Sequence, residues 1–223
     1  MSRRPVVRIA GGAASLVAML ALAMAAMAAM AAGPAGLGGD PPEAADWERW
    51  YELSLDDQPV GWMRRWREHA DGQVRTGREV HLRIERSGTP VVLETRSEFL
   101  ETAGGEPVSA SMRSRSAGSE SWSVWDFTDA GVRERSGEDG RTRERLRTKP
   151  ATGWLTPAAE DLLLRSRLEA GAERIRWRAL DPEAGLAEVS LELVADGREP
   201  LEVNGRRVEA TRWRVQGHPA GGR

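Results

Sequence analysis

Hydrophobic and polar residues alternate from Gln73 to Phe99 with the two-residue period of a half-buried β-strand. Ser87-Gly88 interrupts the alternation as a turn would, and it resumes at Val91. In the first half, one side holds Val74, Thr76, Val80, Leu82 and Ile84, and the other holds Arg75, Glu79, His81, Arg83 and Glu85. The pattern predicts a long antiparallel hairpin with one dry face and one charged, wet face.

Similar alternation on both sides of this hairpin predicts further strands. They are expected at 50–55, 60–66, 108–112, 122–127, around Val132 and Leu146, and at 174–180, 186–194 and 201–208. Asn204-Gly205 is the residue pair preferred in a type I′ turn, so the last segment is predicted to be a hairpin.

One helix is predicted after these strands. Thr156 is a good N-cap, Pro157 suits the first helical position, and Gly171 is a natural stop. The apolar face is predicted to consist of Leu162, Leu163, Leu164 and Leu168. A meander of about ten strands cannot stay flat. We therefore expect a mainly β fold: a large curled antiparallel sheet, or half-open barrel, with one main helix packed in its concave face.

The N-terminus has the composition of an export signal. Arg3, Arg4 and Arg8 precede an apolar run of small residues that ends in Ala-x-Ala sequences. Residues 1–32 are predicted to be a signal peptide, in either the ordinary secretory or the twin-arginine form. The run is long enough to span a bilayer, so an uncleaved anchor is the alternative.

Residues 33–46 are rich in Gly, Pro and Ala and predict a flexible linker. We expect one antiparallel β domain at 47–215 and a C-terminal tail at 216–223. The protein is expected to be periplasmic or extracellular, and to touch a membrane only through its N-terminal segment, if that is retained.

Composition excludes several kinds of chemistry. The chain of 223 residues contains 32 basic and 34 acidic residues, so its net charge of −2 does not favour a nucleic acid partner. It contains no cysteine, which excludes disulfides, thiolate metal sites and a cysteine nucleophile within these residues.

Nine tryptophans stand beside only two phenylalanines and one tyrosine. Trp62, Trp66 and Trp177 lie on predicted strands, and with Leu163 of the helix they could line a cavity for an apolar or sugar-like ligand. The alternative is that the indoles fill the core of a chain that is poor in other aromatic residues.

No catalytic residue, metal site or cofactor is predicted. His81 shares its face with Glu79, but no second histidine is near it in the sequence. The chain also lacks a P-loop, a His-Glu-x-x-His motif and a Gly-x-Ser-x-Gly elbow. Arg141, Arg143, Arg145 and Arg147 alternate with Thr142 and Glu144, which indicates a solvated strand.

The segment from Trp50 to Trp62, W-Y-E-L-S-L-D-D-Q-P-V-G-W, resembles the opening of the N-terminal β domain of secreted bacterial transglutaminase-like proteins. Further matches are Arg86-Ser87-Gly88, Gly105-Glu106-Pro107-Val108 and Leu180-Asp181-Pro182. The resemblance implies the accessory domain without the catalytic one, whose cysteine is missing. The expected architecture is also similar to the half-barrel of periplasmic lipoprotein carriers.

These observations give two functional hypotheses. The first is an exported, non-catalytic β domain that acts in interaction or positioning, with another exported protein as its partner. The second is a periplasmic carrier or sensor that binds an apolar ligand, such as an acyl chain, between sheet and helix. The identity of the ligand or partner and the oligomeric state stay open, as does whether this chain is part of a longer protein.

Overall fold

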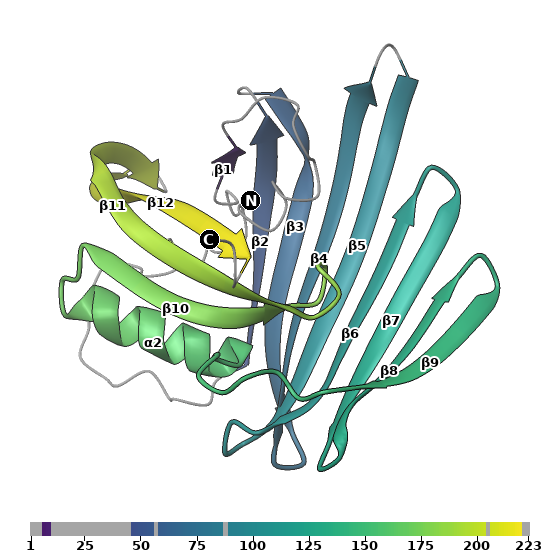
Figure 1. Ribbon diagram of the computed structural model, residues 1–223. Helices are drawn as coiled ribbons and strands as arrows, with labels where there is room; N and C mark the ends of the chain where they lie inside the picture. The colour runs from purple at the N-terminus through teal and green to yellow at the C-terminus, as the bar shows by residue number, and fades with distance from the viewer. Residues whose placement is uncertain (1–5, 10–45, 56–57, 87–88, 204–205, 220–223) are drawn as a thin grey trace.

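The computed structural model describes residues 6–9, 46–55, 58–86, 89–203 and 206–219. Within these ranges the chain forms a nine-stranded sheet, a three-stranded sheet and one helix, α2 (Figure 1). The mainly β fold class, with a large antiparallel sheet that does not close on itself, is therefore confirmed.

The large sheet is a meander in which strands adjacent in sequence are also adjacent in space. Its order is β1 (Val6–Ile9), β2 (Trp47–Leu55), β3 (Gln58–Ala70), β4 (Gln73–Arg86), β5 (Thr89–Thr102), β6 (Pro107–Ser116), β7 (Ser119–Thr128), β8 (Gly131–Glu138) and β9 (Arg141–Arg147). β1 pairs in parallel with β2, and every later pair in this sheet is antiparallel.

The predicted hairpin at 73–99 is confirmed as β4 and β5. Val80 pairs with Thr95 and Leu82 with Leu93, and both Val80 and Leu82 are buried on what we call the inner face. The same face carries two apolar clusters, one around Tyr51 and Met63 and another around Phe99 and Trp125. The alternation seen in the sequence therefore assigns most side chains of this sheet to the correct face.

The helix α2 (Pro157–Glu169) begins and ends as its capping residues predict. The Thr156 side chain accepts a hydrogen bond from the Ala159 amide, and Pro157 opens the first turn. At the other end Gly171 has a φ of +73°, a left-handed conformation that glycine adopts without strain. The Ala172 amide then donates to the Arg167 carbonyl, which closes the last turn in a Schellman motif.

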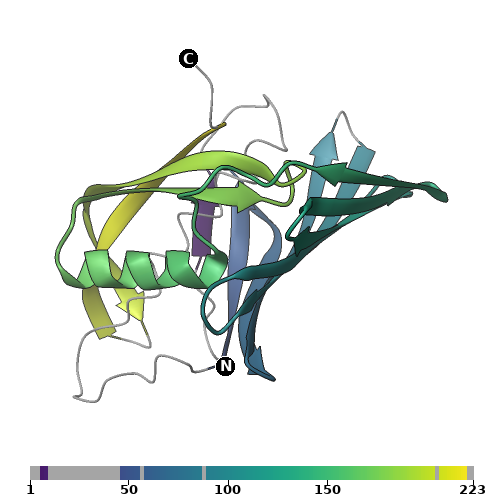
Figure 2. The same ribbon diagram turned by 60° about the horizontal axis from the view of Figure 1, so that its bottom comes forward.

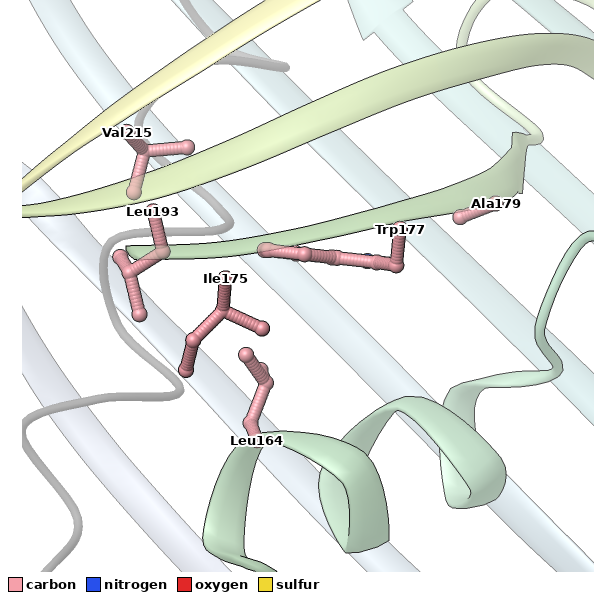
Figure 3. Close-up of a cluster of buried hydrophobic side chains, with 6 residues drawn as sticks. All are labelled: Leu164, Ile175, Trp177, Ala179, Leu193 and Val215. Carbon is pink, nitrogen blue, oxygen red and sulfur yellow. The ribbon is translucent and has the colours of Figure 1, made fainter. Parts of the chain in front are cut away.

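The small sheet consists of β10 (Arg174–Asp181), β11 (Ala187–Val203) and β12 (Arg206–Pro219). α2 packs on it through a buried cluster formed by Leu164, Ile175, Trp177, Ala179, Leu193 and Val215 (Figure 3). The side chains of Leu163 and Leu168 lie against the same cluster.

The small sheet and α2 cover only part of the inner face of the large sheet. Figures 1 and 2 show them over the side where β2–β5 lie, while β6–β9 extend beyond them. The turn between β10 and β11 reaches furthest, since Leu180 and Leu186 contact the cluster around Phe99 and Trp125. We call the part of β6–β9 that lies beyond this contact the open wing.

Several expectations need correction. The strands form two sheets where one was expected, and the predicted strand 186–194 and the first half of the predicted hairpin 201–208 are one strand, β11. A bulge at Ala195–Arg198, with Gly197 at a φ of +93°, lets β11 change direction without ending. β12 continues to Pro219, so residues 216–219 of the predicted tail pair with β11. Leu162 is 40% exposed and does not belong to the buried face of α2.

The other boundaries are only partly described by the structure. β2 begins at Trp47, the first residue of the predicted domain, and β1 lies within the range predicted as a signal peptide. The rest of that signal, the linker except for Asp46, and the turn residues Ser87-Gly88 and Asn204-Gly205 lie outside the described residues.

The contrast between Leu164 and Leu162 gives a stability test. Leu164 is 1% exposed and Leu162 is 40% exposed, although both lie on α2. Leu164→Ala should lower the free energy of unfolding by about 2–5 kcal/mol, because it removes buried methyl groups and leaves a cavity. Leu162→Ala, the matched control, should change it by less than about 1 kcal/mol. Chemical denaturation followed by tryptophan fluorescence measures both, and equal losses would contradict this orientation of α2.

Candidate binding surface

The four residues predicted to line a ligand cavity do not come together. Trp62 and Trp66 project from the outer face of β3, on the side opposite Met63 and Arg65. Trp177 and Leu163 lie in the cluster between α2 and the small sheet. The body of the large sheet separates the two pairs, so the prediction of one cavity lined by all four side chains is wrong.

Trp66 is buried although it lies on the outer face. Its ring lies flat over Gly77, where a Cβ atom would approach the indole to 2.0 Å. The guanidinium groups of Arg64 and Arg96 cover the ring at 4.8 and 5.2 Å from its centroid. Trp66 is 3% exposed as a result, which shows that arginine side chains can bury an indole outside the apolar core.

Trp62 belongs to a second outer-face cluster. Its ring stacks on His81 with centroids 5.8 Å apart and meets Trp50 at 5.0 Å. The Nδ1 atom of His81 lies 3.3 Å from a carboxylate oxygen of Glu94, so the histidine is engaged in a surface network. Charged side chains therefore surround these indoles on the outer face.

Charged residues on the inner face hold α2 and the following turn against the large sheet. Arg65 of β3 lies 3.6 Å from Asp161 of α2, and both side chains are at most 15% exposed. Arg78 of β4 donates a hydrogen bond to Glu183 in the β10–β11 turn, whose side chain is 5% exposed. We call these two pairs the charged anchor.

Glu160, beside Asp161 at the start of α2, is the most perturbed group of this interface. Burial raises the pKa of Glu160 to about 7, and the negative charge of Asp161 acts in the same direction. Arg65, Arg78 and the Trp177 indole favour the charged form and only partly oppose burial. Near neutral pH this carboxyl therefore changes between its neutral and charged forms inside the interface.

Glu101 of β5 is a second buried carboxyl and is 1% exposed. Burial raises the pKa of Glu101, and Thr156, the Ala158 amide and Arg67 oppose this effect only in part. Arg67 is itself 6% exposed. The sequence contains a signal for part of this layer, because Arg78 occupies a position that the alternation assigns to the dry face. Arg65 and Arg67 share that face through the pairing of β3 with β4.

The inner face changes character on the open wing, where hydroxyl groups take the place of large apolar side chains. Two neighbouring rows cross its strands: Met112, Ser123, Ser136 and Arg143 in one, and Ser114, Ser121, Glu138 and Arg141 in the other. A groove of about 480 Å³ lies here, lined by Ser121, Trp122, Ser123, Ser136, Gly137, Glu138, Asp139, Arg141 and Arg143. It is the clearest candidate for a binding surface among the features described above.

The four arginines of β9 fall into two pairs. Arg145 and Arg147 both donate hydrogen bonds to Glu134, whose side chain is 9% exposed. Burial alone would raise the pKa of Glu134, but these two guanidinium groups hold the pKa below its usual value. Arg141 and Arg143 have no ion pair with any residue in the described ranges. On this predicted solvated strand, two arginines therefore hold Glu134, and the other two have no ion pair within the described ranges.

Two other kinds of site receive no support from the described ranges. Within them, no three His, Asp or Glu side chains gather as a metal site would require. No helix that the structure describes is both long and apolar enough to cross a lipid bilayer.

Comparison with known proteins adds little to this geometry. No family model matches the sequence, and no curated protein matches it. Among solved structures, the chain is similar to the crystal structure of a β-barrel-like protein of a domain of unknown function, DUF1849, from Brucella abortus. The two share 11% identity and a TM-score of 0.49, over 74% of this chain and 73% of that one. The relation to transglutaminase-like proteins stays a prediction from short sequence motifs.

The half-buried Glu160 carboxyl predicts a pH-dependent stability. Its folded pKa of about 7 lies above the ordinary value of 4.5. Between pH 4.5 and about 7 the folded state therefore holds a proton that the unfolded state has lost, and stability falls as pH rises through that window. Glu160→Gln removes this pH dependence. The free energy of unfolding of the variant minus that of the natural protein should therefore rise by up to about 3 kcal/mol as the pH increases over that interval.

Urea denaturation at several pH values measures this difference. Glu169→Gln is the matched control, because Glu169 lies on the same helix and is exposed. Parallel pH profiles for the natural protein and the Glu160→Gln variant would contradict the burial of this carboxyl.

Proposed function

We propose that this chain is an exported, non-catalytic interaction module, and that the inner face of the open wing is its binding surface. The observation that carries this proposal is the change along the inner face. Where α2 and the small sheet cover the sheet, the inner side chains are mainly apolar or paired in the charged anchor. Beyond that cover they are mainly hydroxyls and charged groups, including the guanidinium groups of Arg141 and Arg143, around a groove of about 480 Å³.

A polar partner fits this surface better than an acyl chain. Serine side chains and guanidinium groups offer hydrogen bonds to a ligand but little apolar contact area. Since the groove is open along the wing, a segment of another protein can reach it without any opening of the fold.

The alternative carrier function needs apolar space between sheet and helix. Leu164 and Leu193, which lie in that interval, are 1% and 0% exposed and pack against Trp177. The Arg65–Asp161 ion pair occupies the adjoining contact between α2 and the large sheet. An acyl chain would have to displace these side chains, so the geometry favours the interaction module.

The sequence resemblance supports the same proposal. It relates this chain to an accessory domain that lies beside a catalytic domain, which is a positioning role. Export follows from the predicted signal at residues 1–32, and a partner would then be another exported protein.

A probe screen on the isotope-labelled full chain tests the binding surface. The probes are a glutamate-rich peptide, maltohexaose and palmitate, each at millimolar concentration. At least one of the two polar probes should shift the amide resonances of Ser121, Ser123 and Ser136. Ser123→Trp fills the groove and should abolish the shifts, whereas Ser111→Trp, on the outer face of the neighbouring strand β6, should leave them unchanged.

The outcome is decisive in either direction. Shifts confined to the residues around Leu164 and Trp177 on addition of palmitate would replace the proposal with the carrier function. Absence of any shift on the wing with both polar probes would show that this face is not a binding surface.

A further inference from the structure

The large sheet ends at β9, so one side of this strand has no neighbour in the described residues. An edge strand presents unpaired backbone N–H and C=O groups, and an extended peptide can add to it as a further strand. From Arg141 to Leu146 every residue of β9 is exposed, so no other part of the described chain covers the edge.

The side chains of β9 differ on its two faces. On the inner face, Arg141 and Arg143 are the free cations beside the serine-lined groove. On the outer face, Leu146 is 62% exposed, more than either of the other exposed large hydrophobic residues described. The edge therefore combines unpaired backbone groups, two cations at strand spacing and one apolar contact point.

Of the carboxylates near these arginines, Asp139 and Glu134 are engaged by other side chains, and Glu138 forms no ion pair with either arginine in the described ranges. Asp139 accepts a hydrogen bond from Ser119 at 3.1 Å. Glu138 is the cross-strand neighbour of Arg141 but forms no ion pair with it. Glu134 is occupied by Arg145 and Arg147. Arg141 and Arg143 thus keep their capacity to bind a carboxylate from outside the chain.

Building on the function proposed above, we infer that an extended acidic segment of a partner protein adds to β9 as a further antiparallel or parallel strand. Successive residues of a strand point to opposite faces, so Arg141 and Arg143 share one face and Thr142 between them lies on the other. A partner strand with acidic residues at every second position therefore places its carboxylates opposite both guanidinium groups. The residues between them face outward, where an apolar side chain can cover Leu146.

A small anion does not satisfy the same set of groups. It could accept hydrogen bonds from the two arginines, but it leaves the backbone edge and Leu146 exposed to water. A peptide strand satisfies all three features together, and cross-strand pairs of opposite charge add to its backbone hydrogen bonds.

The test uses a short fluorescent peptide that alternates glutamate with valine, and the full chain titrated into it while fluorescence anisotropy is followed. Arg141→Glu/Arg143→Glu should weaken binding by at least about tenfold, because attraction across the edge becomes repulsion. The control, Arg133→Glu/Arg135→Glu, makes the same change of charge at the same spacing on the outer face of β8, and should weaken binding much less.

Two further peptides separate the parts of the inference. A glutamine–valine peptide of the same length should bind more weakly than the acidic one. A glutamate–valine peptide with N-methylated backbone amides should also bind more weakly, because it cannot form the hydrogen bonds of a strand.

Each contrary result has a distinct meaning. If the glutamine–valine peptide binds as tightly as the glutamate–valine peptide, the inference of an acidic partner is wrong, while the open wing is still a binding surface. Equal binding of the N-methylated peptide would overturn strand addition and leave a simple anion site. If no peptide binds, the inference fails, and the probe screen with maltohexaose decides separately whether the proposed function fails with it.

Discussion

The ion pairs between the large sheet and the α2 region fix how much of the inner face is covered. Arg65–Asp161 and Arg78–Glu183 join β3 and β4 to residues more than 90 positions later in the sequence. Buried charges lose their hydration, so such pairs contribute modest net stability but penalise any arrangement that leaves one partner alone. The charged anchor therefore disfavours positions of α2 and the β10–β11 turn that would separate these pairs.

The side chains of the inner face change from apolar to polar where the elements that cover it end. Phe99, Trp125 and Val132 lie where Leu186 and Trp154 reach the sheet, and they are apolar. Ser123 and Ser136 lie on the same strands beyond that reach, and they are hydroxyls. If this uncovered part of the inner face carried apolar side chains, it would promote non-specific association with other proteins. Serine avoids that cost and leaves groups that can bind a polar partner.

Features that depend on neighbouring residues could be predicted from the sequence. The β4–β5 hairpin follows from alternation over Gln73 to Phe99, and the ends of α2 follow from Thr156, Pro157 and Gly171. The candidate site was not predicted. Arg141 and Arg143 were interpreted as part of a solvated strand, and nothing near them in the sequence shows that Glu134 would engage only their neighbours Arg145 and Arg147. The sequence predicts Trp62 and Trp66 in a cavity, whereas Trp66 is buried on the outer face by arginines that no local pattern identifies as its cover.

The sequence by itself determined which side chains share a face of each strand, where the helix begins and ends, and that the fold is mainly β. These properties are set by steric and hydrogen-bonding rules that act over a few residues along the chain. Only the tertiary structure decided that there are two sheets, that the cover leaves part of β6–β9 exposed, and which arginines form no ion pair within the described residues. Those outcomes depend on contacts such as Arg78–Glu183, whose partners lie far apart in sequence, so no local pattern specifies them.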